Sequence, residues 1–131
     1  SEAIRTSAEE IFESAELEHE VVVQDVDACL ARERWLHVYR IAQEAVSNIV
    51  KHAGAGEATL SLRRDGEHVV LRVSDDGRAD SSALEEGLGI QGMRERAKQL
   101  GATLRIAAGL DGRGLGLALE VPVDGARADR G

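Results

Sequence analysis

Residues 40–53 read RIAQEAVSNIVKHA and predict a helix with a polar stripe along an otherwise apolar surface. Glu44, Asn48 and His52 follow at four-residue steps, so their side chains lie one turn apart on one helix face. A carboxylate and an amide oxygen are suitable magnesium ligands, and the neighbouring Lys51, like His52, can donate hydrogen bonds to phosphates. The alternative is a helix face in contact with water, as for most charged helix positions.

The composition of the chain indicates a single globular domain. It has 131 residues, 43% of them hydrophobic and 31% charged, which is enough for one domain with a core. The formal net charge of −8 argues against general affinity for nucleic acid, so any phosphate site has to be local. Cys29 is the only cysteine, which excludes an intrachain disulfide and fits a reducing compartment.

The location of the chain is expected to be cytoplasmic. The sequence has neither the run of about 20 apolar residues needed to cross a membrane nor a signal peptide, so no membrane contact by this domain is expected. Because the chain begins at Ser1 without a methionine, we interpret it as a piece of a longer protein, whose parent could still be anchored in a membrane.

Hydrophobic periodicity divides the chain into alternating elements. Helices are predicted over 1–16, 33–53 and 90–100, and strands over 20–26, 58–64, 68–75, 103–108 and 115–123. The expected core contacts of the long helix are Leu36, Tyr39, Ala42, Val46, Ile49 and Val50. The order of the elements predicts an α+β fold, a two-layer sandwich with a mostly antiparallel sheet and helices on one face. Residues 1–123 form the predicted domain and 124–131 a polar tail.

Asp75-Asp76-Gly77 ends a strand that is otherwise apolar. A carboxylate there can accept a hydrogen bond from an exocyclic amine such as that of adenine, and the glycine allows close approach to the backbone. Such a buried bond is worth about 1.5–3 kcal/mol, enough to choose adenine over guanine. The alternative for an Asp-Gly pair after a strand is a simple turn.

A glycine-rich segment, GLGIQGMRERA, stands at residues 87–97, directly before and within the last predicted helix. Backbone amides in such a loop, together with the positive end of a helix, can hold phosphates. Its spacing also matches the dinucleotide-binding fingerprint. The context does not match, because that fingerprint follows a strand within a βαβ unit, whereas here a long polar loop comes first.

In the order QEAVSNIVKHA, VSDDG and GLGIQGMRERAKQLGA, these segments resemble the ATP-binding catalytic domain of bacterial sensor histidine kinases, within the class that includes gyrase, Hsp90 and MutL ATPases. The likeness extends from the first helix to Pro122 and is greatest for the NarX/DesK/DegS-like subgroup, whose partners are NarL-type response regulators. It implies the Bergerat ATP-binding fold and the cofactors ATP and Mg.

The resemblance also implies roles for individual residues. Asn48 matches the magnesium ligand, and Glu44 matches the acidic residue near the metal and the γ-phosphate, the candidate catalytic residue. Asp75 matches the carboxylate that reads adenine. The remaining implied nucleotide contacts are Lys51, His52, Gly77, Gly87, Leu88, Gly89, Gly92 and Met93.

Two positions depart from the family pattern. Ala79 stands where a second glycine is usual, and Leu115 stands where a threonine usually supports the adenine carboxylate. A phosphoacceptor histidine is normally followed by an acidic residue on a dimerisation helix. His19 precedes Glu20 but lies at the entry to a strand, while His37 and His68 have no acidic successor.

We therefore expect a domain that binds Mg-ATP and donates the γ-phosphate to a histidine on a separate dimerisation domain, with little autophosphorylation in isolation. One alternative is a free-standing, anti-sigma-factor-like serine kinase that binds a protein partner. Another is a degenerate scaffold that binds no nucleotide, an alternative favoured by Ala79 and Leu115 and opposed by intact Asn48 and Asp75.

Overall fold

The computed structural model describes residues 1–52, 56–77, 89–108 and 114–125. Its helical elements are α1 (Glu2–Ser14), the 3₁₀ helix η1 (Asp27–Cys29), α2 (Arg32–His52) and α4 (Ile90–Leu100). Its strands are β1 (Glu18–Val23), β2 (Glu57–Asp65), β3 (His68–Asp75), β4 (Thr103–Ala108) and β5 (Leu115–Pro122).

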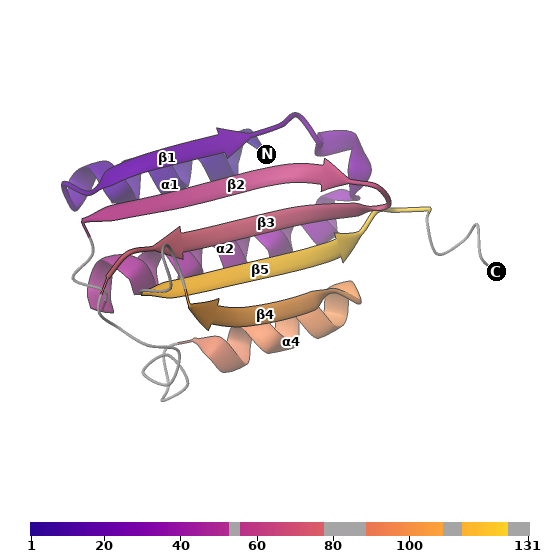
Figure 1. Ribbon diagram of the computed structural model, residues 1–131. Helices are drawn as coiled ribbons and strands as arrows, with labels where there is room; N and C mark the ends of the chain where they lie inside the picture. Colours follow the sequence, from indigo (N-terminus) through magenta and orange to yellow (C-terminus); the bar gives the residue numbers. More distant parts are fainter. Residues whose placement is uncertain (53–55, 78–88, 109–113, 126–131) are drawn as a thin grey trace.

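The described strands form one sheet in the order β1-β2-β3-β5-β4. β1 runs parallel to β2, and the other neighbouring pairs are antiparallel. Figure 1 shows α1, α2 and α4 together behind the sheet, so the helices cover one face. The predicted two-layer α+β fold with a mixed, mostly antiparallel sheet is confirmed.

The side of α2 that faces the sheet differs from the predicted one. Val38, Ile41 and Ala45 are buried together with the predicted Ala42, Val46 and Ile49. The prediction was wrong for Leu36 and Val50, which are 61% and 37% exposed. At 3.6 residues per turn, Leu36 points about 200° away from Val38 and hence toward solvent. Tyr39 is partly buried against the core.

The first strand begins and ends earlier than predicted. It covers 18–23 rather than 20–26, and its pairing with β2 runs from Glu18 to Val23. The backbone of Gln24 donates one more hydrogen bond, to Leu62 O at 2.9 Å. The chain then turns into η1, where the backbone N–H of Asp27 donates to the Asp25 carboxylate at 3.4 Å. The predicted strand was too long because an apolar pattern does not reveal where pairing stops.

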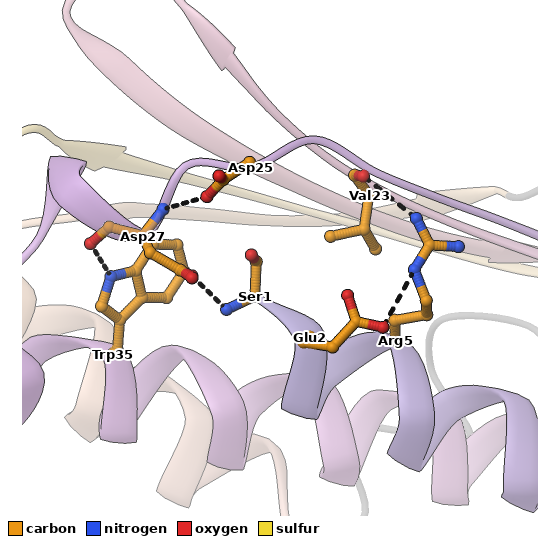
Figure 2. Close-up of polar contacts among 7 residues, drawn as sticks. All are labelled: Ser1, Glu2, Arg5, Val23, Asp25, Asp27 and Trp35. Carbon is orange, nitrogen blue, oxygen red and sulfur yellow. Dashed lines mark hydrogen bonds and ion pairs between the residues drawn. The ribbon is translucent and has the colours of Figure 1, made fainter.

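Polar contacts close the outer edge of β1 (Figure 2). Arg5 of α1 donates to the backbone oxygens of Val21 and Val23 at 3.5 and 3.1 Å. These carbonyls would otherwise be open for pairing with another strand. Next to them, Trp35 donates its indole N–H to Asp27 O at 3.0 Å. The ammonium of Ser1 donates a hydrogen bond to the Asp27 carboxylate, which lowers the pKa of Asp27.

Arg34 and Asp124 join the start of α2 to the ends of α4 and β5. Arg34 donates to Leu100 O at 2.6 Å, to Pro122 O at 2.9 Å and to the carboxylate of Asp124. That carboxylate also accepts a hydrogen bond from the backbone of Ala31, directly before α2. Ordered contacts thus continue to Asp124, the first residue of the predicted tail. The division of the chain at this point stays a prediction, because residues 126–131 lie outside the described residues.

Candidate nucleotide site

The polar stripe of α2 extends from the solvent into the interior. Glu44 is half-buried, Asn48 is only 3% exposed and Lys51 is exposed. His52 is the last residue of the helix, and its side chain is outside the described part of the structure. Among the described residues, Asn48 and Asp75 are the buried polar or charged ones. The burial of Asn48 argues against the alternative of a helix face in contact with water at this position.

Asp75 lies at the end of β3 and is fully buried. Its Oδ1 accepts a hydrogen bond from the backbone N–H of Gly77 at 2.6 Å, so the carboxylate is held in one orientation. The neighbouring Asp76 accepts hydrogen bonds from the backbone of Gly56 and Glu57, both at 3.0 Å. These bonds fix the start of β2, shortly after the end of α2, against the end of β3.

Gly114 packs directly against Asp75. Its φ of +65° is a left-handed conformation that favours glycine. A Cβ atom on Gly114 would lie 2.2 Å from Asp75 Oδ1 and 2.6 Å from both Asp75 O and Gly77 N. The carboxylate therefore depends on a glycine nearly forty residues later in the chain. The sequence analysis missed this residue, although a glycine directly before a strand was a usable signal.

A small, mostly apolar hollow lies between α2 and the sheet, with a cavity volume of about 20 Å³. Its walls come from α2, β3, α4 and β5, and are formed by Ala45, Asn48, Ile49, Val73, Met93, Gly116 and Leu117. Asn48 and Met93 were predicted as site residues, and here they line one hollow. Val73 lines the hollow and lies two positions before Asp75 on the same face of β3, so the buried carboxylate lies next to the hollow.

Gly89 brings the start of α4 onto the polar stripe. It precedes Ile90, the first residue of the helix, and has a φ of +78°. A Cβ atom on Gly89 would lie 2.1 Å from Glu44 Oε1, so the two predicted site residues are in direct contact. Gly92 lies inside α4 with open space around it. Gly87, Leu88 and Ala79 lie outside the described residues, as does the side chain of Leu115.

The residues present fit an adenine nucleotide with magnesium. Apolar walls beside a buried carboxylate suit a flat base with an exocyclic amine. In the described ranges, no three His, Cys, Asp or Glu side chains lie together as a metal site. Magnesium does not require such a cage, since it usually retains waters and binds through one or two protein oxygens together with phosphates. Asn48 lines the hollow, and its side-chain amide has an oxygen of the kind that magnesium binds.

Comparison with known proteins identifies the family. A family model described as "Histidine kinase-, DNA gyrase B-, and HSP90-like ATPase" matches residues 33–125. The chain belongs to this family. Sensor histidine kinase YxjM of Bacillus subtilis (strain 168) is 38% identical over 86 residues, 66% of this chain and 21% of that protein. Sensor protein VraS of Staphylococcus aureus (strain COL) is 33% identical over 90 residues, 67% of this chain and 26% of that protein.

Solved structures share the fold. The blue-light activated histidine kinase of Erythrobacter litoralis EL346 superposes with a TM-score of 0.77 at 24% identity, covering 94% of this chain and 41% of that one. The ATP binding domain of PrrB from Mycobacterium tuberculosis superposes with a TM-score of 0.73 at 20% identity, covering 93% and 92%. The prediction of a histidine-kinase-type ATPase domain is therefore confirmed.

The finer predictions remain open. This chain spans about a fifth to a quarter of the length of the curated relatives named above. The NarL-partner subgroup, the roles of the site residues and the cytoplasmic location stay predictions. None of the helices in the described part is both long and apolar enough to cross a membrane.

Proposed function

We propose that this chain is the catalytic domain of a two-component sensor kinase, which binds Mg-ATP and presents the γ-phosphate to a histidine on a dimerisation helix. The observation that carries the proposal is the fully buried Asp75 beside a hollow with apolar walls. A fully buried carboxylate beside apolar walls is a hydrogen-bond acceptor of the kind that the exocyclic amine of a base can use, which supports a binding role. The cognate receiver of the phosphate is a NarL-type response regulator.

Different side chains contact the base, the metal and the reacting group. Asp75 accepts the hydrogen bond from the exocyclic amine of adenine, with its orientation held by the Gly77 N–H. Asn48 holds magnesium, which neutralises charge on the phosphates when bound. Lys51 and His52 donate to the phosphates from the last turn of α2. Glu44, in contact with the start of α4, is the candidate base for the proton of the attacking imidazole.

The reaction transfers one phosphoryl group. The bond between the γ-phosphorus and the bridging oxygen breaks, ADP leaves, and a phosphorus–nitrogen bond forms with the acceptor histidine. The protein contributes chiefly position and charge stabilisation, as is general for phosphoryl transfer. None of the described histidines other than His52 lies on the polar stripe, and His19 is stacked on Phe12. We take the acceptor to be a histidine on another domain.

Calorimetric titration with ATP tests the binding step. We expect magnesium-dependent binding that weakens at least tenfold in Asp75→Asn, since a lost hydrogen bond to a charged group is worth about 1.5–3 kcal/mol. Asn48→Asp should alter the dependence on magnesium. Asp65→Asn is the matched control, because Asp65 is exposed in the β2–β3 turn. Unchanged ATP affinity in both Asp75→Asn and Asn48→Asp would refute the assignment of the site.

Labelling with ATP radioactive at the γ-phosphate tests the transfer step. The chain alone should acquire no acid-labile phosphate, whereas a fragment of its parent kinase that carries a dimerisation helix should be labelled on histidine when mixed with it. Glu44→Gln should slow this labelling and leave ATP affinity within about threefold. Acid-stable label on a serine of a partner would instead favour the serine-kinase alternative.

A further inference from the structure

The sheet has a groove on the face that the helices leave open. In Figure 1 this is the face toward the viewer, with α1, α2 and α4 behind the sheet. The groove has a volume of about 260 Å³ and lies over β5 and its neighbours β3 and β4. We call it the back groove and define it by Arg72, Ser74, Arg105, Ala107, Gly116 and Ala118.

The shape of the back groove follows from the strand register. Small residues form its floor, since Gly116 pairs with Ala107 and Ala118 lies two positions further along β5. Ala118 pairs with Arg72 on one side and with Arg105 on the other. At one strand spacing on each side, the two arginine Cα atoms are about 10 Å apart. Two guanidinium groups thus flank a shallow channel whose base is formed by small residues.

The charges in the back groove favour an anionic occupant. Arg72 is exposed, and its side chain makes no hydrogen bond or ion pair in the described part of the chain. Arg105 is 71% exposed, and its ion pair with Glu120 is long, at 4.0 Å. Exposed pairs of this kind contribute little, so the guanidinium group can take another partner at small cost. Because the whole chain has a net charge of −8, binding of an anion in the back groove depends on these two local arginines and not on the overall charge.

We propose that the back groove is a docking site for an extended acidic segment of a partner protein. The channel follows β5 from Gly116 to Glu120, a length of about 13 Å at the rise of a strand, which suits several extended residues. Arg72 and Arg105 pair with carboxylates on either side of the segment. Ala118 and Gly116 allow its backbone to lie close to the sheet. Glu120 lies at one end of the back groove, so the carboxylates of the segment pair with the arginines away from that end.

Fluorescence anisotropy with a labelled hexaglutamate peptide tests this site at low salt on the full chain. We expect saturable binding that weakens at least tenfold in the double variant Arg72→Ala with Arg105→Ala. Arg40→Ala is the matched control, since it removes an exposed arginine from α2, on the other side of the molecule, and should change affinity less than twofold. Ala118→Leu keeps the charge but fills the floor, and it should also weaken binding at least tenfold.

Three results would overturn the proposal. One is the absence of saturable binding, and another is an equal loss in Arg40→Ala, which would indicate general attraction. The third is tighter, arginine-dependent binding of inorganic phosphate or of a single-stranded oligonucleotide, which would assign the groove to another class of ligand. Thermal unfolding of each variant confirms folding. ATP affinity should be unchanged in the arginine variants. The ATP titration and the peptide titration therefore test the nucleotide site and the back groove separately.

Discussion

The substitution Gly114→Ala examines how the base-reading carboxylate is held. A side chain at φ +65° costs about 1–2 kcal/mol because of the left-handed backbone. The new Cβ would also lie 2.2 Å from Asp75 Oδ1 and 2.6 Å from two backbone atoms. Since these backbone atoms cannot swing aside, the Asp75–Gly77 hydrogen bond is lost, which costs a further 1.5–3 kcal/mol, roughly.

Gly66→Ala is the matched control for this substitution. Gly66 has a similar φ of +61°, but nothing lies within 4 Å of the position of a Cβ. It should therefore cost only the backbone term of about 1–2 kcal/mol. For 131 residues, 1 kcal/mol corresponds to about 3–4 °C in Tm. We expect Tm to fall by about 8–20 °C in Gly114→Ala and by about 3–8 °C in Gly66→Ala.

Calorimetric titration and thermal unfolding of both variants test the contact between Gly114 and Asp75. Gly114→Ala should also lose at least tenfold in ATP affinity, since Asp75 moves, whereas Gly66→Ala should retain the affinity of the parent chain. Equal Tm losses in the two variants, with ATP affinity preserved in both, would refute the reasoning that Gly114 and Asp75 are in tight contact.

Four further substitutions probe other contacts. Arg34→Ala should lower the free energy of unfolding by about 2–4 kcal/mol in urea, because it leaves Leu100 O and Pro122 O without their donor; a loss below 0.5 kcal/mol, roughly, would contradict this. Gly89→Ala should weaken ATP binding and stability together, since its Cβ would overlap Glu44; unchanged titrations would count against the contact. Leu36→Ala should change stability by less than about 0.5 kcal/mol, while Ile41→Ala should cost about 2–5 kcal/mol; the reverse order would mean that the helix faces the other way.

Local sequence signals were sufficient to predict most of the helices and strands. The hairpin at Asp65-Gly66 and the helix that ends at Gly101 were predicted because their turn and capping residues stand next to the elements they end. Local signals also selected the candidate site residues, whose roles stay predictions. Asn48 and Asp75 each belong to a short, characteristic segment, and both are buried.

The features that the sequence did not predict depend on contacts between distant parts of the chain. Leu36 looked like a core residue because an apolar residue near the start of a helix does not reveal the helix rotation, which the sheet sets. The parallel pairing of β1 with β2 and the packing of Gly114 against Asp75 likewise join segments that share no local pattern. Gly116 and Leu117 line the hollow because of the register of β5 in the sheet, which their local sequence does not reveal.

The bond from Ala31 to Asp124 has a consequence for synthesis of the protein. Its two partners are 93 positions apart, and it anchors the residue directly before the helix that carries Glu44 and Asn48. At 5–20 residues per second, a ribosome needs roughly 5 to 20 seconds to make the chain between them. Throughout that interval the start of α2 has no carboxylate from Asp124 and no Pro122 carbonyl for Arg34. The start of α2 can therefore be anchored only after the last strand has been synthesised. A ribosome stalled before Asp124 would expose an incompletely anchored domain to proteases.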